Sequence, residues 1–280
     1  MIWITAIVIL AMTTVICLVA IFTLRTTQDV GDGSSAEVGE GSSAEVGEGS
    51  STEVGHDIWK DIKPLLSEST KLVSVGGSCV TRRRIEELYK ECEMDKGPSH
   101  FFDNTLEGFE TVLEIIRTSN ISPLFDDSNL KSTGEIHGQY TRINMVSNDW
   151  ASVHDVPVEK TQAQMQEFKQ KYLRRHQRLV EFIKNNEFEM YFIRFDPVSK
   201  TEAERFIGII QNINPQCRFL LVSLSEEKVE TLKGRHFMRM HLSDEFQLKP
   251  RADDEHWTRP YLNWTAIWHS VLKNGVKKIE

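Results

Sequence analysis

The sequence predicts an α/β domain in which a mostly parallel sheet carries helices on both faces. Strand-like apolar segments alternate with amphipathic helical segments along residues 56–280. Two of the strands, Glu189–Phe195 and Cys217–Leu224, are nearly continuous apolar runs, which is typical of strands buried on both faces. Such alternation indicates crossover helices and a parallel sheet. We therefore expect a three-layer domain, preceded by a single transmembrane helix and a disordered linker.

The first segment, residues 1–24, contains no charged side chain. As a helix, Ile2–Leu24 would be roughly 34 Å long, against a hydrocarbon core of about 30 Å. A retained transmembrane anchor is the favoured interpretation, and a cleaved signal peptide is the alternative. Signal peptides usually have a basic start and a shorter apolar core. We therefore expect a single-pass membrane protein of the secretory pathway, with the membrane as a partner.

The signals for membrane orientation conflict. Arg25 follows the apolar run and favours a cytosolic body by the positive-inside rule. Lys277 and Lys278, near the C-terminus, resemble a dilysine retrieval signal, which also works in the cytosol. The glycosylation sequons at Asn120 and Asn263 would matter only in a lumen. The side of the membrane on which the body lies therefore stays open.

Residues 25–55 form an acidic linker in which an octapeptide of the type Gly-Glu-Gly-Ser-Ser-Ala-Glu-Val occurs three times. Each copy has only one branched apolar residue, which cannot offset the entropy lost on ordering. We expect a disordered tether with an end-to-end distance on the order of 30 Å. The linker holds seven acidic residues and accounts for most of the net charge of -8. This acidic balance argues against a nucleic-acid partner, which requires a basic face.

The spacing of apolar residues places the elements of the body in order. Helices are expected over Asp57–Leu66, Thr81–Glu91, Leu106–Arg117, Thr161–Asn185, Lys200–Asn212 and Asn263–Leu272. Strands are expected over Lys71–Val75, Glu189–Phe195, Cys217–Leu224 and His236–Leu242. Residues 118–150 are polar and irregular, with short strands expected around Glu135–Tyr140 and Arg142–Val146. Ligands of parallel sheets bind beyond the carboxyl ends of the strands, so functional residues are sought there.

The first strand ends in Gly76-Gly77-Ser78-Cys79, and a helix follows at once. Glycines permit a tight turn, and the free N–H groups of a helix N-terminus favour a thiolate or an oxyanion. Arg82–Arg84 add positive charge. The motif predicts a nucleophile at Cys79 or Ser78. The alternatives are a structural turn with a buried cysteine and a non-catalytic, anchored domain that binds an anion at this turn.

Two histidines have neighbours that suggest a catalytic base. His154 is followed by Asp155, and Asp253 precedes His256 by three residues in a loop before the last helix. A carboxylate beside an imidazole can orient it as a general base. The sequence contains no metal-ligand spacing and no cofactor fingerprint, so we expect neither a metal nor a cofactor.

These motifs, in this order, resemble a domain-of-unknown-function family described as papain-like cysteine peptidases. The resemblance covers residues 71–224 and rests on Val73-Ser-Val-Gly-Gly-Ser-Cys79, Phe101-Phe102-Asp103, His154-Asp155, Tyr172-Leu-Arg-Arg-His-Gln-Arg178 and Phe192-Ile-Arg194. Asn104 stands where the family usually has tryptophan. The resemblance implies that Cys79 is the nucleophile, His154 the base, and Asp155 or Asp103 the orienting acid.

The predicted layout also resembles SGNH-type esterases, which have Gly-Asp-Ser after the first strand and Asp-x-x-His before the last helix. Here Gly77 replaces the usual aspartate. This resemblance implies an esterase or deacetylase that uses Ser78, Asp253 and His256. The leading hypothesis is a membrane-anchored hydrolase with Cys79 as nucleophile. Its substrate, a peptide or an acylated glycan, is not determined by the sequence.

Cysteine pairing depends on the compartment. Cys17 lies in the expected anchor, which leaves Cys79, Cys92 and Cys217 in the body. In a lumen, a disulfide between Cys92 and Cys217 would leave Cys79 as the free thiol. The sequence alone does not decide whether this bond forms.

Overall fold

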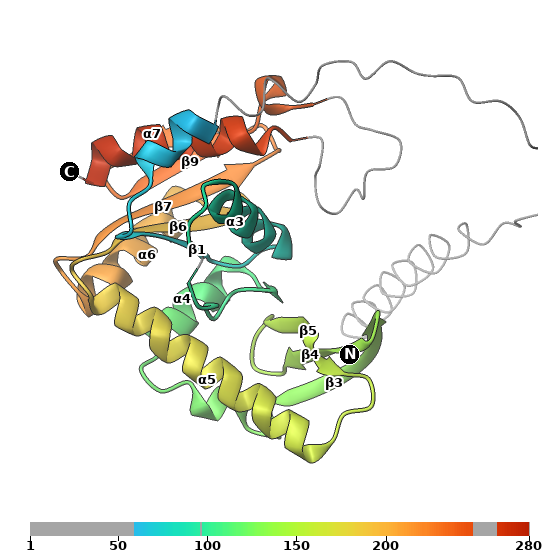
Figure 1. Ribbon diagram of the computed structural model, residues 1–280. Coiled ribbons are helices and arrows are strands. Elements are labelled where there is room, and N and C mark those ends of the chain that lie inside the picture. The colour runs from blue at the N-terminus through green and yellow to red at the C-terminus, as the bar shows by residue number, and fades with distance from the viewer. Residues whose placement is uncertain (1–58, 96, 249–261, 280) are drawn as a thin grey trace, which may run out of the picture. The chain divides into compact units, whose positions relative to one another are not determined.

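The computed structural model describes residues 59–95, 97–248 and 262–279 (Figure 1). The predicted anchor (1–24), the predicted linker (25–55) and the residues Asp253 and His256 lie outside these described residues. Among the described helices, none combines the length and the apolar character that crossing a membrane requires.

The body is a mixed α/β fold built on a five-stranded sheet, as the alternating pattern predicts. Its strands, in spatial order, are β1 (Thr70–Ser74), β6 (Glu189–Phe195), β7 (Arg218–Ser225), β9 (Phe237–His241) and β8 (Leu232–Lys233). The first four run parallel, and β8 pairs antiparallel with β9 at the edge. The carboxyl ends of β1 and β6 therefore lie side by side, because these two strands are neighbours.

Successive side chains of these strands enter two different hydrophobic clusters. Val73 of β1 and Phe192 of β6 belong to one cluster, while Leu72 and Ile193 belong to the other. Side chains alternate between the two faces of a strand, so each cluster marks one face of the sheet. Both faces of the sheet are therefore buried, which explains the nearly continuous apolar runs of its central strands.

Helices cover both faces of this sheet (Figure 1). Helices α3 (Cys79–Glu91) and α7 (Trp264–Ile279) contribute to the cluster that contains Leu72. Helices α4 (Phe109–Arg117), α5 (Gln162–Lys184) and α6 (Lys200–Ile213) contribute to the cluster that contains Val73. Short 3-10 turns occur at η1 (Lys63–Leu65), η2 (Ser122–Phe125) and η3 (Asp244–Phe246).

A second sheet, which the sequence predicts only in part, lies between α3 and α5 in the chain. It is antiparallel and has the order β2 (Thr105–Leu106), β5 (Ala151–Pro157), β4 (Tyr140–Met145) and β3 (Leu130–His137). Of the two short strands expected there, Arg142–Val146 overlaps most of β4. The other, Glu135–Tyr140, covers only the end of β3, the turn and the first residue of β4. The sequence pattern misses β2 and β5, because β2 has two residues and β5 is interrupted by polar side chains.

Local capping explains where three helices begin. The Thr161 hydroxyl caps α5 and the Ser199 hydroxyl caps α6, each within a reciprocal capping box. Helix α6 begins at the predicted residue, and α5 begins one residue after the predicted Thr161. Helix α4 begins three residues later than predicted, because Gly108 donates its backbone N–H to Asp149, 2.7 Å away, and Thr111 donates its hydroxyl to the same carboxylate.

Candidate active site

The predicted turn lies directly beyond the carboxyl end of β1. Gly76 and Gly77 have φ angles of +74° and +82°, in the left-handed region that favours glycine. Helix α3 then begins at Cys79, two residues before the predicted start, with Ser78 as its N-cap. Cys79 is half-buried. The thiol therefore lies at a helix N-terminus on the sheet edge where parallel α/β proteins bind ligands.

Ser78 uses its polar groups to close the start of α3. Its Oγ accepts the Val80 N–H at 3.2 Å, and its carbonyl oxygen accepts the Thr81 N–H at 3.3 Å. These two N–H groups are therefore engaged. An oxyanion contact from this turn would have to come from N–H groups that precede Val80.

Two carboxyl groups lie against the glycines of the turn. A Cβ atom added at Gly76 would overlap Glu107 Oε1, and one added at Gly77 would overlap Asp196 Oδ2. Glu107 follows β2, and Asp196 directly follows β6. The lack of side chains at the turn is thus what admits both carboxyls. Sequence reasoning missed Glu107 and Asp196, because neither belongs to a recognisable motif.

Arg194, the penultimate residue of β6, joins the parts of this site. Its Nη1 donates to the Val75 carbonyl oxygen at 3.0 Å, and its Nη2 donates to the Glu107 carbonyl oxygen at 3.1 Å. Nη2 also lies 3.3 Å from Asp196 Oδ2. The guanidinium is 5% exposed and stacks over the ring of Phe109. One side chain thus holds the end of β1, the Glu107 segment and Asp196 together.

Glu107 is protonated at neutral pH. Burial raises the pKa of its carboxyl from 4.5 to about 8, although the charge of Arg194 acts in the opposite direction. The carboxyl of an unfolded chain ionises near its ordinary pKa. Ionisation of Glu107 therefore opposes folding, and its stabilising contribution is lost as the pH rises from 4.5 through about 8.

The variant Glu107→Gln should remove this pH dependence. Between about pH 6 and about pH 9, its stability should rise relative to the parent protein by roughly 2 kcal/mol. The measurement is urea unfolding at both pH values. Glu110→Gln is the matched control, because Glu110 is exposed on α4 and pairs with Arg205. If both variants follow the pH dependence of the parent, the pKa of Glu107 is not raised in the folded protein.

The structure does not bring His154 and Asp155 together as a catalytic pair. Adjacent strand residues point to opposite faces, and His154 is exposed on β5. Its ring centroid lies 6.4 Å from the rings of His137 and Tyr140. Asp155 points the other way, toward α5.

Asp155 is held by other partners. It accepts hydrogen bonds from Ser152 Oγ at 2.8 Å, from Lys171 Nζ and from the Tyr172 hydroxyl. Burial alone would raise the pKa of Asp155, but the hydrogen bonds from Lys171 and Tyr172 outweigh burial and lower it. The carboxylate is therefore a fixed anion that anchors β5 to α5.

Asp103, the other acid implied by the family resemblance, pairs with an arginine. It is fully buried, and its Oδ2 accepts the backbone N–H of His100 at 2.7 Å. Arg82 Nε lies 3.4 Å from the same oxygen. Burial raises the pKa of Asp103 to about 6, and the Arg82 charge opposes this shift. Asp103 is thus bound to the α3 helix that carries Cys79.

The two remaining body cysteines lie on opposite faces of the main sheet. Cys92 belongs to the cluster on the α3 side, and Cys217 belongs to the cluster on the α6 side. The disulfide considered for a luminal body is therefore not formed. Burial raises the pKa of the Cys92 thiol and raises that of Cys217 to about 11. Neither is a reactive thiol.

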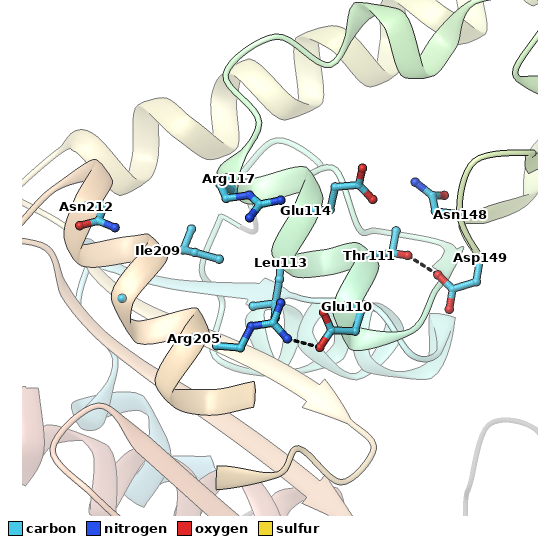
Figure 2. A pocket seen from close by; sticks show the side chains of 11 residues that line it. Glu110, Thr111, Leu113, Glu114, Arg117, Asn148, Asp149, Arg205, Ile209 and Asn212 are labelled. Atoms are coloured by element: carbon cyan, nitrogen blue, oxygen red, sulfur yellow. Dashed lines mark hydrogen bonds and ion pairs between the residues drawn. The ribbon is translucent and has the colours of Figure 1, made fainter. Parts of the chain in front are cut away.

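A separate groove of about 550 Å³ lies between α4 and α6 (Figure 2). An ion pair between Glu110 and Arg205 crosses it, and Asp149 lies at its end beside Thr111. Of the predicted nucleophiles and bases that the structure describes, Ser78, Cys79 and His154, none lines this groove. In the described segments, no cluster of three or more histidine, cysteine or acidic side chains could hold a metal ion.

Comparison with known proteins finds no similar protein. No family model matches the chain, and no curated protein or solved structure matches it.

Proposed function

We propose that the domain is a hydrolase that works by nucleophilic acyl transfer, with Cys79 as the attacking residue. The observation that carries this proposal is the position of Cys79 at the first residue of α3, beyond the carboxyl end of β1. The dipole and N–H groups of a helix N-terminus favour a thiolate, which is the nucleophilic form of cysteine. The left-handed glycines at this turn leave room for the carboxyls of Glu107 and Asp196 close to the backbone.

The capping role of Ser78 favours Cys79 over Ser78 as the nucleophile. Ser78 Oγ accepts the Val80 N–H and so completes the first turn of α3. Attack by Ser78 would break this N-cap hydrogen bond, and an N-cap typically contributes about 1 kcal/mol to the stability of the protein.

The proposed reaction has two steps. The Cys79 thiolate attacks the acyl carbon of an ester or amide, the bond to the leaving oxygen or nitrogen breaks as that atom takes a proton from solvent water, and a thioester forms. Water then attacks the thioester, loses a proton and releases the acid and the thiolate. Asp196 is the carboxylate that we place as acceptor of this proton, because it lies against Gly77 and is half-buried. His154, exposed beside Tyr140 on the second sheet, is not used in this proposal.

Alkylation by iodoacetamide tests the activated thiol. At neutral pH, Cys79 should react about tenfold faster than a model thiol, because a helix N-terminus favours the thiolate. Peptide mass spectrometry reports each cysteine separately. Cys92 and Cys217 are the internal controls and should stay unmodified in the folded protein, since both are buried. A rate for Cys79 no faster than that of the model thiol would remove the basis of the proposal.

Acylation by p-nitrophenyl acetate distinguishes the two nucleophiles. The parent protein and Ser78→Ala should both carry the acetyl group on Cys79, whereas Cys79→Ala should release no burst of nitrophenol. Asp196→Asn should still be acylated but should lose the acetyl group more slowly. Loss of the burst in Ser78→Ala and its retention in Cys79→Ala would instead support the esterase hypothesis with Ser78.

A further inference from the structure

A buried basic cluster begins one helical turn after Cys79. Arg82 follows Cys79 by three residues on α3, so the two residues share a face of the helix. Arg82 is 2% exposed, and its Nε donates to Glu86 at 3.0 Å and lies 3.4 Å from Asp103 Oδ2. Its Nη1 and Nη2 atoms are buried and have no hydrogen-bond partner within the described part of the chain.

Helix α5 adds two arginines to this cluster. Arg175 is 5% exposed, its guanidinium lies over the ring of Tyr172, and its Nη1 has no hydrogen-bond partner among the described residues. Oδ2 of Asp155 lies 3.9 Å from this Nη1 atom. Nε of Arg178 is likewise buried without a partner, while the rest of Arg178 is half-exposed. The cluster therefore extends from the buried side of α3 to the surface of α5.

His100 shares a buried partner with Arg82, because Asp103 Oδ2 accepts the His100 backbone N–H at 2.7 Å and lies 3.4 Å from Arg82 Nε. Burial, together with the charges of Arg82, Arg178 and Arg175, lowers the pKa of its imidazole to about 3. The ring is therefore neutral at pH 7, and its Nδ1 has no hydrogen-bond partner in the described structure. A neutral imidazole can present an N–H donor at this atom.

The negative charges at hand leave much of this cluster unpaired. Glu86 and Asp103 both engage Nε of Arg82, and Asp155 is already bound by Lys171 and the Tyr172 hydroxyl. Buried guanidinium groups in folded proteins are normally hydrogen-bonded to an anion or another acceptor. The planar fork of an arginine matches the paired oxygens of carboxylate, phosphate and sulfate groups. What the cluster lacks is an oxoanion.

We propose that Arg82, Arg175 and Arg178 bind an oxoanionic group of the substrate beside Cys79. This group is a carboxylate, a phosphoryl group or a sulfate, held at the unpartnered guanidinium N–H groups with His100 as a further donor. Its assignment to the substrate rests on the proposed function of Cys79, whereas the binding of the anion does not. The substrate class is accordingly an acyl compound that carries a negative charge near the bond that is cleaved.

Calorimetric titration of the full-length chain with potassium phosphate, sulfate or acetate tests the site. At constant ionic strength and neutral pH, at least one salt should give saturable binding relative to chloride. Arg178→Gln and Arg82→Lys should each weaken it about tenfold, since each removes guanidinium donors. Arg178 is half-exposed, so its variant carries the test if the buried Arg82→Lys variant does not fold. Arg83→Gln is the control, because Arg83 neighbours Arg82 but is exposed and pairs with Glu87.

The results separate this inference from the proposed function. If no salt binds, or if both variants bind as the parent does, the anion site is wrong, whatever Cys79 does. If a salt binds through these arginines but Cys79 is unreactive, the proposed function is wrong and the anion site stands. If the anion site and the reactive thiol both hold, the anionic reagent iodoacetate should be favoured at Cys79. The ratio of the iodoacetate rate to the iodoacetamide rate should then be higher for Cys79 than for a model thiol. The bound salt should lower this ratio. An unchanged ratio would overturn the placement of the anion beside Cys79.

Discussion

Replacing Arg194 by methionine is expected to destabilise the domain by about 3–5 kcal/mol, because it breaks a buried charged network. Methionine fills much of the same volume but donates no hydrogen bond. The carbonyl oxygens of Val75 and Glu107 would each lose the donor that Arg194 provides at 3.0 and 3.1 Å. Guanidinium-induced unfolding, followed by circular dichroism, measures the loss.

Two further variants show which property of Arg194 matters. Arg194→Lys should have an intermediate effect, because an ammonium group carries the charge but cannot reach two carbonyl oxygens as a rigid fork. Arg205→Met is the control, since Arg205 and its partner Glu110 are both exposed. Its effect should stay within about 1 kcal/mol, the usual range for a surface ion pair. Equal losses in Arg194→Met and Arg205→Met would contradict the role of Arg194 at the centre of the site.

Replacing Gly76 by alanine should lower the free energy of unfolding by about 3 kcal/mol or more. The loss combines backbone strain with the overlap of the added Cβ atom. Gly76 has a φ of +74°, and its added Cβ would overlap the buried carboxyl of Glu107. Glu107 is 6% exposed, so it has little room to move. The unfolding midpoint in urea measures the loss, and slower alkylation of Cys79 would report the displaced turn.

Gly134→Ala is the matched control for the backbone contribution. Gly134 has nearly the same φ, +77°, but no atom lies within 4 Å of an added Cβ. The control should lose only about 1–2 kcal/mol from the left-handed conformation. Glu107→Ala in the Gly76→Ala chain should recover part of the difference, because it removes the overlapping carboxyl. If Gly76→Ala and Gly134→Ala lose the same stability, the contact with Glu107 does not constrain the turn.

Much of the main sheet could be read from the sequence, because its strands are buried on both faces. The predicted strand Glu189–Phe195 coincides with β6, and the predicted Cys217–Leu224 is displaced by one residue from β7. The second sheet could not be read in the same way. Most side chains of β3 are exposed, so no apolar pattern marks that strand. Its pairing with β4 and the pairing of β4 with β5 are antiparallel contacts between separate segments.

That second sheet also changes the interpretation of His154 and Asp155. Adjacent in sequence, they suggested an imidazole with its orienting acid. On β5 their side chains point to opposite faces of the sheet, because successive residues of a strand alternate between faces. The two acids that lie against the glycine turn, Glu107 and Asp196, come from segments with no recognisable motif.

By itself, the sequence determined the local parts of this protein. The apolar periodicity specifies the parallel strands, the Thr161 and Ser199 caps specify two helix starts, and Gly76–Cys79 specifies a strand-to-helix turn. These features depend on a few consecutive residues, whose backbone and side-chain preferences act locally. They place a thiol at a helix N-terminus at the sheet edge.

Only the tertiary structure decided which groups surround that thiol. Glu107, Asp196 and Arg194 meet at the glycine turn, and Asp103 meets Arg82 of α3, although these residues come from separate segments of the chain. Their protonation and pairing follow from burial and from neighbouring charges, and both depend on how distant segments pack. A buried carboxyl or guanidinium cannot be distinguished from an exposed one until the chain that covers it is in place.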